Sequence, residues 1–173
     1  MKDLLNTLYE SEQEDQWHVE RLDYNNYVNI VESKIRNVFS KGAFSELNAE
    51  KVVEVIYLII YKKGSARFAC TLGRGEDNVL RCPFSAPFGY LEEIKSKQSV
   101  SDFYRAAAAV NDYLDNANEK AVTITFPPLF YDNKIIGVWI NALFQTGWKV
   151  EYFEINYAFH IPDIFENYPL YLQ

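Results

Sequence analysis

Three β-rich runs separated only by short turns, between residues 51 and 85, constrain the fold most strongly. The first run, KVVEVIYLIIYKK, is rich in Val, Ile and Tyr and ends at a glycine. The second and third, ARFACTLG and VLRCPFS, are joined through GRGEDN, whose Gly, Asp and Asn favour a tight turn. Strands joined by short turns run antiparallel. We therefore predict an antiparallel meander from residues 51–63, 66–73 and 79–85.

The residues before the meander predict a strand and a helix. WHVERL, residues 17–22, is a short strand candidate. Residues 24–44 predict a single helix ended at Gly42, because the apolar residues recur at spacings of three and four. These apolar residues are Val28, Val31, Ile35, Val38 and Phe39.

After the meander, helices and strands alternate. Ser99 and Asp102 resemble a capping pair at the start of a helix. The predicted order is a helix over residues 99–120, a strand over 121–128, a helix over 133–147 and a strand over 148–161. The sequence thus predicts one α/β (α+β) domain over residues 1–173, with a mixed, mostly antiparallel sheet and helices on both faces.

Composition excludes several classes of protein. The chain of 173 residues is 49% hydrophobic and 24% charged, which is typical of a globular domain with a core. Its net charge is −7 and it has no dense basic cluster, so nucleic acid is not expected as a main partner. The longest apolar run, VIYLII, is too short to span a bilayer, and the first residues do not form a signal peptide. We expect a cytoplasmic protein that does not enter the membrane.

The two cysteines are expected to be thiols. Cys70 and Cys82 lie nearly opposite each other if the hairpin turn centres near Glu76, so a redox pair is the alternative to two small apolar residues in a sheet. With only two histidines, His18 and His160, they form no recognisable zinc site, and no metal is predicted.

Three segments carry a resemblance to a known family. PFSAPFGYLEE (residues 83–93) precedes a helix, TITFPPLFYD (123–132) contains a strand that ends in two prolines, and FEINYAFHIPDIFENY (153–168) follows. Together with the order of elements, they resemble GNAT-like acyltransferases, and in particular the N-terminal domain of FemAB-type proteins. The resemblance implies a GNAT-like fold over roughly residues 17–168.

The resemblance implies the transfer of an acyl or aminoacyl group from a thioester or charged carrier to an amine, often on an amino sugar or cell-wall precursor. Acetyl-CoA or another acyl-CoA would be the donor. However, the family's Arg/Gln-x-x-Gly-x-Gly/Ala pyrophosphate loop is missing, because FGYLEEIKSKQSVSD stands in its place. No cofactor is therefore firmly predicted, and the alternative is a non-catalytic domain that binds a substrate or a partner through a degenerate GNAT fold.

The kink in the segment SAPFGY is a candidate substrate-binding site. The prolines and Gly89 predict that the strand leaves the sheet here, so Ser85 and Tyr90 would face a ligand in the gap. Phe88 and Gly89 are the other candidate substrate-binding residues of this segment. The alternative is a purely structural loop anchored by its phenylalanines.

The segment PPLFYDN places two more candidates at the carboxyl end of a strand, where open α/β sheets bind ligands. Asp132 would bind substrate or, alternatively, cap the next helix. Tyr131 is a candidate acid for the leaving group, and His160 and Glu154 are candidate general bases for the amine.

The expected partners are a small-molecule substrate and either a second GNAT-like domain or a second copy of the chain. In the family that the chain resembles, the tail FENYPLYLQ, residues 165–173, would lead into a second domain. Its apolar side chains need a cover, which a homodimer would supply.

Overall fold

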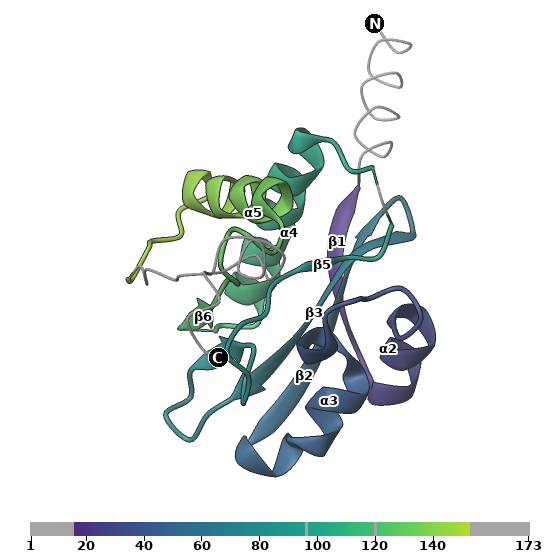
Figure 1. Ribbon diagram of the computed structural model, residues 1–173, viewed down its shortest axis with the longest axis vertical. Coiled ribbons are helices and arrows are strands. Elements are labelled where there is room, and N and C mark those ends of the chain that lie inside the picture. The colour runs from purple at the N-terminus through teal and green to yellow at the C-terminus, as the bar shows by residue number, and fades with distance from the viewer. Residues whose placement is uncertain (1–15, 96, 120, 153–173) are drawn as a thin grey trace, which may run out of the picture.

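A computed structural model of the chain describes residues 16–152, except residues 96 and 120 (Figure 1). The described part is a mixed α+β fold with a six-stranded, mostly antiparallel sheet and four α-helices. In chain order the elements are β1 (Trp17–Leu22), α2 (Tyr24–Val31), the 3-10 turn η1 (Val38–Ser40), α3 (Gly42–Leu47), the 3-10 turn η2 (Ala49–Lys51), β2 (Glu54–Lys62), β3 (Ser65–Arg74), β4 (Leu80–Cys82), β5 (Glu92–Glu93), α4 (Val100–Asn116), β6 (Val122–Ile124) and α5 (Asn133–Gln145).

The predicted meander is confirmed. The strand order is β1-β2-β3-β4-β6, and β1/β2, β2/β3 and β3/β4 pair antiparallel. The pair β4/β6 is parallel, because the chain returns through α4 before it enters the sheet again. The short strand β5 also pairs antiparallel with β3, further along the edge that β4 uses.

Helices cover both faces of the sheet, as the sequence predicts (Figure 1). Helices α4 and α5 bury one face around Trp139, which is fully buried and touches the rings of Phe68 and Phe103. The predicted capping pair is confirmed, since Ser99 and Asp102 form a capping box at the start of α4. Buried alanines such as Ala106 let α4 lie close to the strands.

The other face is covered by α2, with Tyr27, Val31 and Ile35 against Tyr57 and Ile59 of β2. The prediction of one continuous helix over residues 24–44 is wrong. Helix α2 stops at Val31, and Gly42 begins α3 instead of ending a helix. The apolar spacing that predicted one helix includes Val38, which is 54% exposed, so this residue does not belong to the buried stripe.

The predicted strand over residues 121–128 is shorter than expected, since β6 comprises three residues. The helix over 133–147 is confirmed as α5, and Gly147 adopts a φ of 102° just beyond it. The predicted last strand over 148–161 falls largely outside the described residues. Its first five residues, 148–152, are described and form no strand.

Candidate functional site

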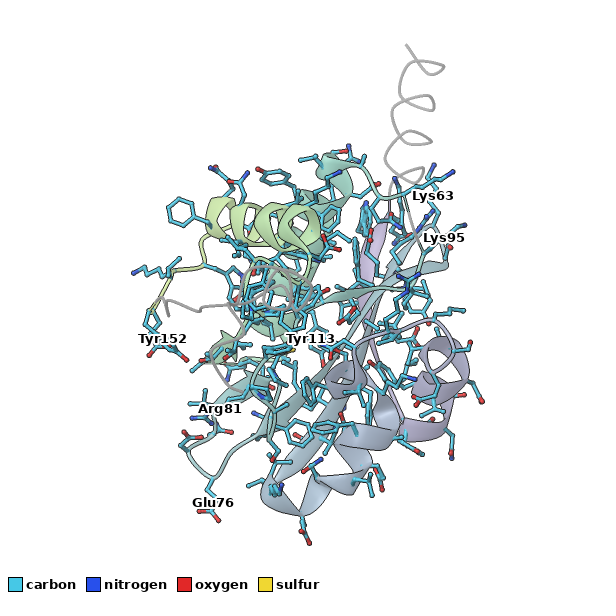
Figure 2. The ribbon with its side chains drawn as sticks, viewed as in Figure 1. Lys63, Glu76, Arg81, Lys95, Tyr113 and Tyr152 are labelled. Atoms are coloured by element: carbon cyan, nitrogen blue, oxygen red, sulfur yellow. The ribbon has the colours of Figure 1, made fainter. Side chains whose placement is uncertain are left out.

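The sheet opens where β4 ends. The chain leaves the edge of β3 at Cys82, which precedes the cis-proline Pro83, and it returns to the same edge as β5. Figure 2 labels residues at the two ends of the sheet. Toward one end lie Lys63, at the β2–β3 turn, and Lys95, just after β5. Toward the other end lie Glu76 and Arg81. Residues 83–91 therefore interrupt one antiparallel edge, and we call this segment the kink.

The kink is fixed to the segment that follows β6. Thr125 N donates to the carbonyl of Cys82, at 2.8 Å, and Gly89 N donates to the carbonyl of Thr125, at 2.9 Å. These bonds attach the two ends of the kink to the residue just after β6. Beyond them, β5 pairs with β3, while the chain after β6 proceeds to α5. The strands thus diverge around the kink, as the sequence predicts.

Aromatic rings run from η1 across the kink to the start of α5. The ring of Phe39 in η1 lies 5.4 Å from that of Phe88, and Phe88 lies 4.9 Å from Tyr131. The ring of Phe130 stacks on that of Tyr131, at 5.1 Å. We call these four residues the aromatic row. Phe130 and Tyr131 are more than half exposed, so this end of the row is accessible from solvent.

A buried carboxylate, Glu92, lies in the strand that leaves the kink. The side chain is 7% exposed, and its Oε1 accepts a hydrogen bond from Ser40 Oγ, at 3.3 Å. Burial raises the pKa of Glu92 from its ordinary value of 4.5 to about 7, against the lowering effect of the nearby Asn37 and Ser40 side chains. A carboxylate with a pKa near neutrality can accept and release a proton at physiological pH.

Other acidic groups surround this carboxylate. Glu93 and Asp132 each raise the pKa of Glu92 by repulsion, and Asp132 does the same to Glu93 and Tyr90. None of the ion pairs between the described residues involves Glu92, Glu93 or Asp132. The site is therefore electrostatically negative, which favours a cationic ligand such as a protonated amine.

The structure brings most of the predicted substrate-binding residues together. Phe88 contacts Tyr131, Tyr90 packs on Phe126 at 5.9 Å, and Asp132 interacts electrostatically with Tyr90. The alternative role of Asp132 is observed as well, because its carboxylate caps α5 by accepting from Ile135 N, at 3.1 Å.

Of the remaining predicted residues, Gly89 and Ser85 are described by the structure, and Glu154 and His160 are not. Gly89 is buried against Pro83, whose ring a Cβ would meet at 3.0 Å, so its role in the fold is backbone packing. Ser85 is exposed and has a φ of 58°. The candidate bases Glu154 and His160 lie outside the described residues and stay predictions.

Glu92 is not among the site residues that the sequence predicts. The residues Glu92–Glu93 look like an exposed acidic pair after a loop, and only the pairing of Glu92 with Ala69 of β3 buries one of them. The sequence offers no local signal for this burial, because Leu91 and Ile94 lie three residues apart and do not show the period-two alternation of a half-buried strand.

The start of α4 stands where the resemblance would expect a CoA pyrophosphate. Ser99 Oγ accepts from Asp102 N, at 3.3 Å, and Asp102 Oδ2 accepts from Ser99 N, at 2.8 Å. The second oxygen of Asp102 pairs with Lys62 Nζ, at 2.8 Å. The protein's own carboxylate, paired with Lys62, therefore takes up a backbone N–H at this helix end.

A separate groove of about 340 Å³ lies between β6 and α5. Its walls are mainly apolar and include Ile124, Phe126, Leu143 and Trp148. It shares residues 126–129 with the segment that leads to Tyr131, but neither Glu92 nor the kink lines it. The aromatic row and the groove are therefore two different surfaces.

The cysteines are thiols, as expected. Cys70 and Cys82 are both buried and free, and a hydrogen bond to Cys70 together with burial raises the pKa of Cys82 well above its ordinary value. Neither thiol is activated as a nucleophile. In the described part of the chain, no group of three or more His, Cys, Asp or Glu side chains is arranged to hold a metal ion.

Comparisons of this chain with protein-family models, with curated proteins and with solved structures found no match. Among the described helices, none has both the length and the apolar character that crossing a membrane requires.

Proposed function

We propose that this chain is a GNAT-like domain that transfers an acyl group from a thioester to an amine held beside the kink. The observation that carries the proposal is the buried carboxylate of Glu92, whose pKa of about 7 suits a general base at neutral pH. The arrangement of the strands supports it, because a meander is followed by a helix and then by β6, parallel to β4.

In the proposed reaction, Glu92 is the general base and Tyr131 is the proton donor. Glu92 accepts the proton of an ammonium or amine, and the freed nitrogen lone pair attacks the thioester carbonyl carbon. When the tetrahedral intermediate collapses, the carbon–sulfur bond breaks and the thiolate leaves with the bonding pair. Tyr131, exposed at the end of the aromatic row, is the proposed proton donor to that thiolate.

The acceptor is proposed to be a cationic amine. The unpaired carboxylates of Glu93 and Asp132 attract a positive charge, and the exposed rings of Phe130 and Tyr131 can stack on its carbon skeleton. An amino sugar fits this description, since it offers both an ammonium group and an apolar ring face. A cytoplasmic setting is part of the proposal, because two buried free thiols suit a reducing compartment.

A second candidate, a domain that binds the amine without catalysis, is favoured by the closed start of α4. Because Asp102 occupies that helix end, the nucleotide part of CoA has no anion site there. If the chain is an enzyme, its donor is held through the acyl and thioester part alone.

The test is the release of free thiol from a thioester in the presence of glucosamine at pH 7.5. Acetyl-CoA and the short analogue S-acetyl-N-acetylcysteamine should react at similar rates, because the protein does not bind the nucleotide part of CoA. The variant Glu92→Gln should lower the rate by about 10²–10⁴-fold. Absence of amine-dependent thiol release, combined with binding of glucosamine to the wild-type chain, would favour the non-catalytic candidate.

A further inference from the structure

The turn η1 presents two side chains to Glu92. Ser40, which is 3% exposed, donates from Oγ to Glu92 Oε1, and the side-chain amide of Asn37 lies close enough to lower the pKa of the same carboxyl. Asn37 is the cap of η1 and Ser40 is its last residue. A hydroxyl and an amide from one short turn therefore converge on a single carboxylate.

The orientation of the Asn37 side chain is fixed by the turn. Its Oδ1 accepts from Phe39 N, at 3.1 Å, which leaves Nδ2 as the group that can donate toward Glu92. This Nδ2 is buried and has no hydrogen-bond partner of good geometry. A buried donor beside a carboxylate that has a pKa near 7 forms a strong bond only when that carboxylate is ionised.

The turn is itself held at both ends. Tyr27 of α2, which is fully buried, donates from its hydroxyl to the carbonyl of Ser40, at 3.0 Å. Phe39 contacts Phe88 of the kink on one side and Phe44 of α3 on the other. Because these contacts tie η1 to α2, α3 and the kink, its polar side chains cannot follow the carboxylate if it moves.

We propose that Asn37 and Ser40 are positioning residues that hold the Glu92 carboxylate in one place against the turn η1 and favour its ionised form. That Glu92 acts as a base, and so needs to be kept in one orientation, rests on the proposed function.

Repulsion and burial raise the pKa of Glu92, whereas Asn37 and Ser40 lower it. Ionised Glu93 and Asp132 disfavour a charge on Glu92, and so does its buried surrounding. Asn37 and Ser40 are the two groups that lower its pKa, so the pH at which Glu92 titrates is a balance between them and the acids. The titratable groups that interact with Glu92 come from four segments: Tyr27 of α2, Cys82 of β4, Tyr90 and Glu93 around β5, and Asp132 before α5.

The test follows the titration of Glu92 in the full chain by the ¹³C signal of its side-chain carboxyl, assigned by its loss in Glu92→Gln. Ser40→Ala should raise the pH of this titration by about half a unit to one unit, the equivalent of one hydrogen bond. Asn37→Asp keeps the acceptor that caps η1 but replaces the donor by a like charge, so it should raise the titration by about one unit or more.

The matched control is Ser45→Ala. Ser45 is also a buried serine, 1% exposed in α3, and its Oγ has no partner, so its removal should leave the Glu92 titration unchanged. If Ser40→Ala and Asn37→Asp both titrate like Ser45→Ala, the proposal is overturned. Either variant alone decides it if the other fails to fold. A wild-type chain without acyl transfer would contradict the proposed function and leave the titration result standing.

Discussion

Glu92 is the residue on which the chemistry of this site depends. It is buried on strand β5, its carboxyl faces two side chains from η1, and it has two acidic neighbours. Burial without a cation disfavours the charged form and is the largest cause of its raised pKa. Such a group is costly to keep for stability alone, which is why we assign it a function.

The raised pKa of Glu92 makes folding stability depend on pH in a defined direction. Between about pH 4.5 and 7 the folded chain binds more protons than the unfolded chain, so the contribution of Glu92 is full below pH 4.5 and is lost as pH rises through 7. A shift from 4.5 to about 7 corresponds to about 3 kcal/mol. Glu92→Gln should therefore be more stable than wild type by a few kcal/mol at pH 8 and differ little at pH 4.5.

Urea unfolding of both proteins at pH 4.5 and pH 8 measures this difference. Glu50→Gln removes the same charge at an exposed position and serves as the control. A stability difference between wild type and Glu92→Gln that is the same at both pH values would contradict the raised pKa.

At the scale of elements, the kink depends on a close approach between one of its aromatic rings and strand β3. Phe84, the first aromatic residue of the kink, is 5% exposed and lies over Gly73 of β3. A Cβ on Gly73 would come within 2.4 Å of the Phe84 ring. In the sequence this glycine looks like part of the hairpin turn, but the structure places it in the strand as the space for that ring.

Gly73→Ala should destabilise the chain by about 1–3 kcal/mol, because the ring of Phe84 must shift from its place. Phe84→Leu should relieve part of this clash, so the double variant should lose less than the sum of the two single changes. Thermal unfolding of the four proteins measures the coupling. If the stability losses of the two single variants simply added up in the double variant, Gly73 would not provide the space for the Phe84 ring.

The sequence predicted those elements whose signals are local. The meander was predicted because its β-branched runs and its Gly/Asp/Asn turn are adjacent in the chain, and α4 because its capping pair lies three residues apart. The break after α2 was not predicted, because the apolar spacing continues through Val38, which the structure leaves 54% exposed. The burial of Glu92 was missed because β5 is two residues long and is defined only by its pairing with β3, which is distant in the chain.

At the scale of the whole molecule, the site lies at the junction of every layer. The η1 turn comes from the α2 face of the sheet, β5 from its edge, and Tyr131 and Asp132 from the start of α5 on the other face. The site therefore requires the complete described fold, and the predicted homodimer through residues 165–173 concerns residues outside it.

The closed helix end of α4 leads to a prediction about CoA. A pyrophosphate loop supplies several charge-assisted hydrogen bonds, each of about 1.5–3 kcal/mol, whereas the start of α4 holds the carboxylate of Asp102, bonded to Ser99 N and paired with Lys62. Titration calorimetry of the wild-type chain with acetyl-CoA should therefore detect no binding in the low-micromolar range. A low-micromolar dissociation constant would show that CoA is held in another way.

The pH dependence of acyl transfer tests the central claim most directly. With glucosamine and S-acetyl-N-acetylcysteamine, kcat/KM of the wild-type chain should rise with pH through an apparent pKa of about 7, as Glu92 ionises. Glu92→Gln should lose this inflection along with most of the rate. If the variant kept both the wild-type rate and the wild-type pH profile, Glu92 would not be the base and the site would lie elsewhere.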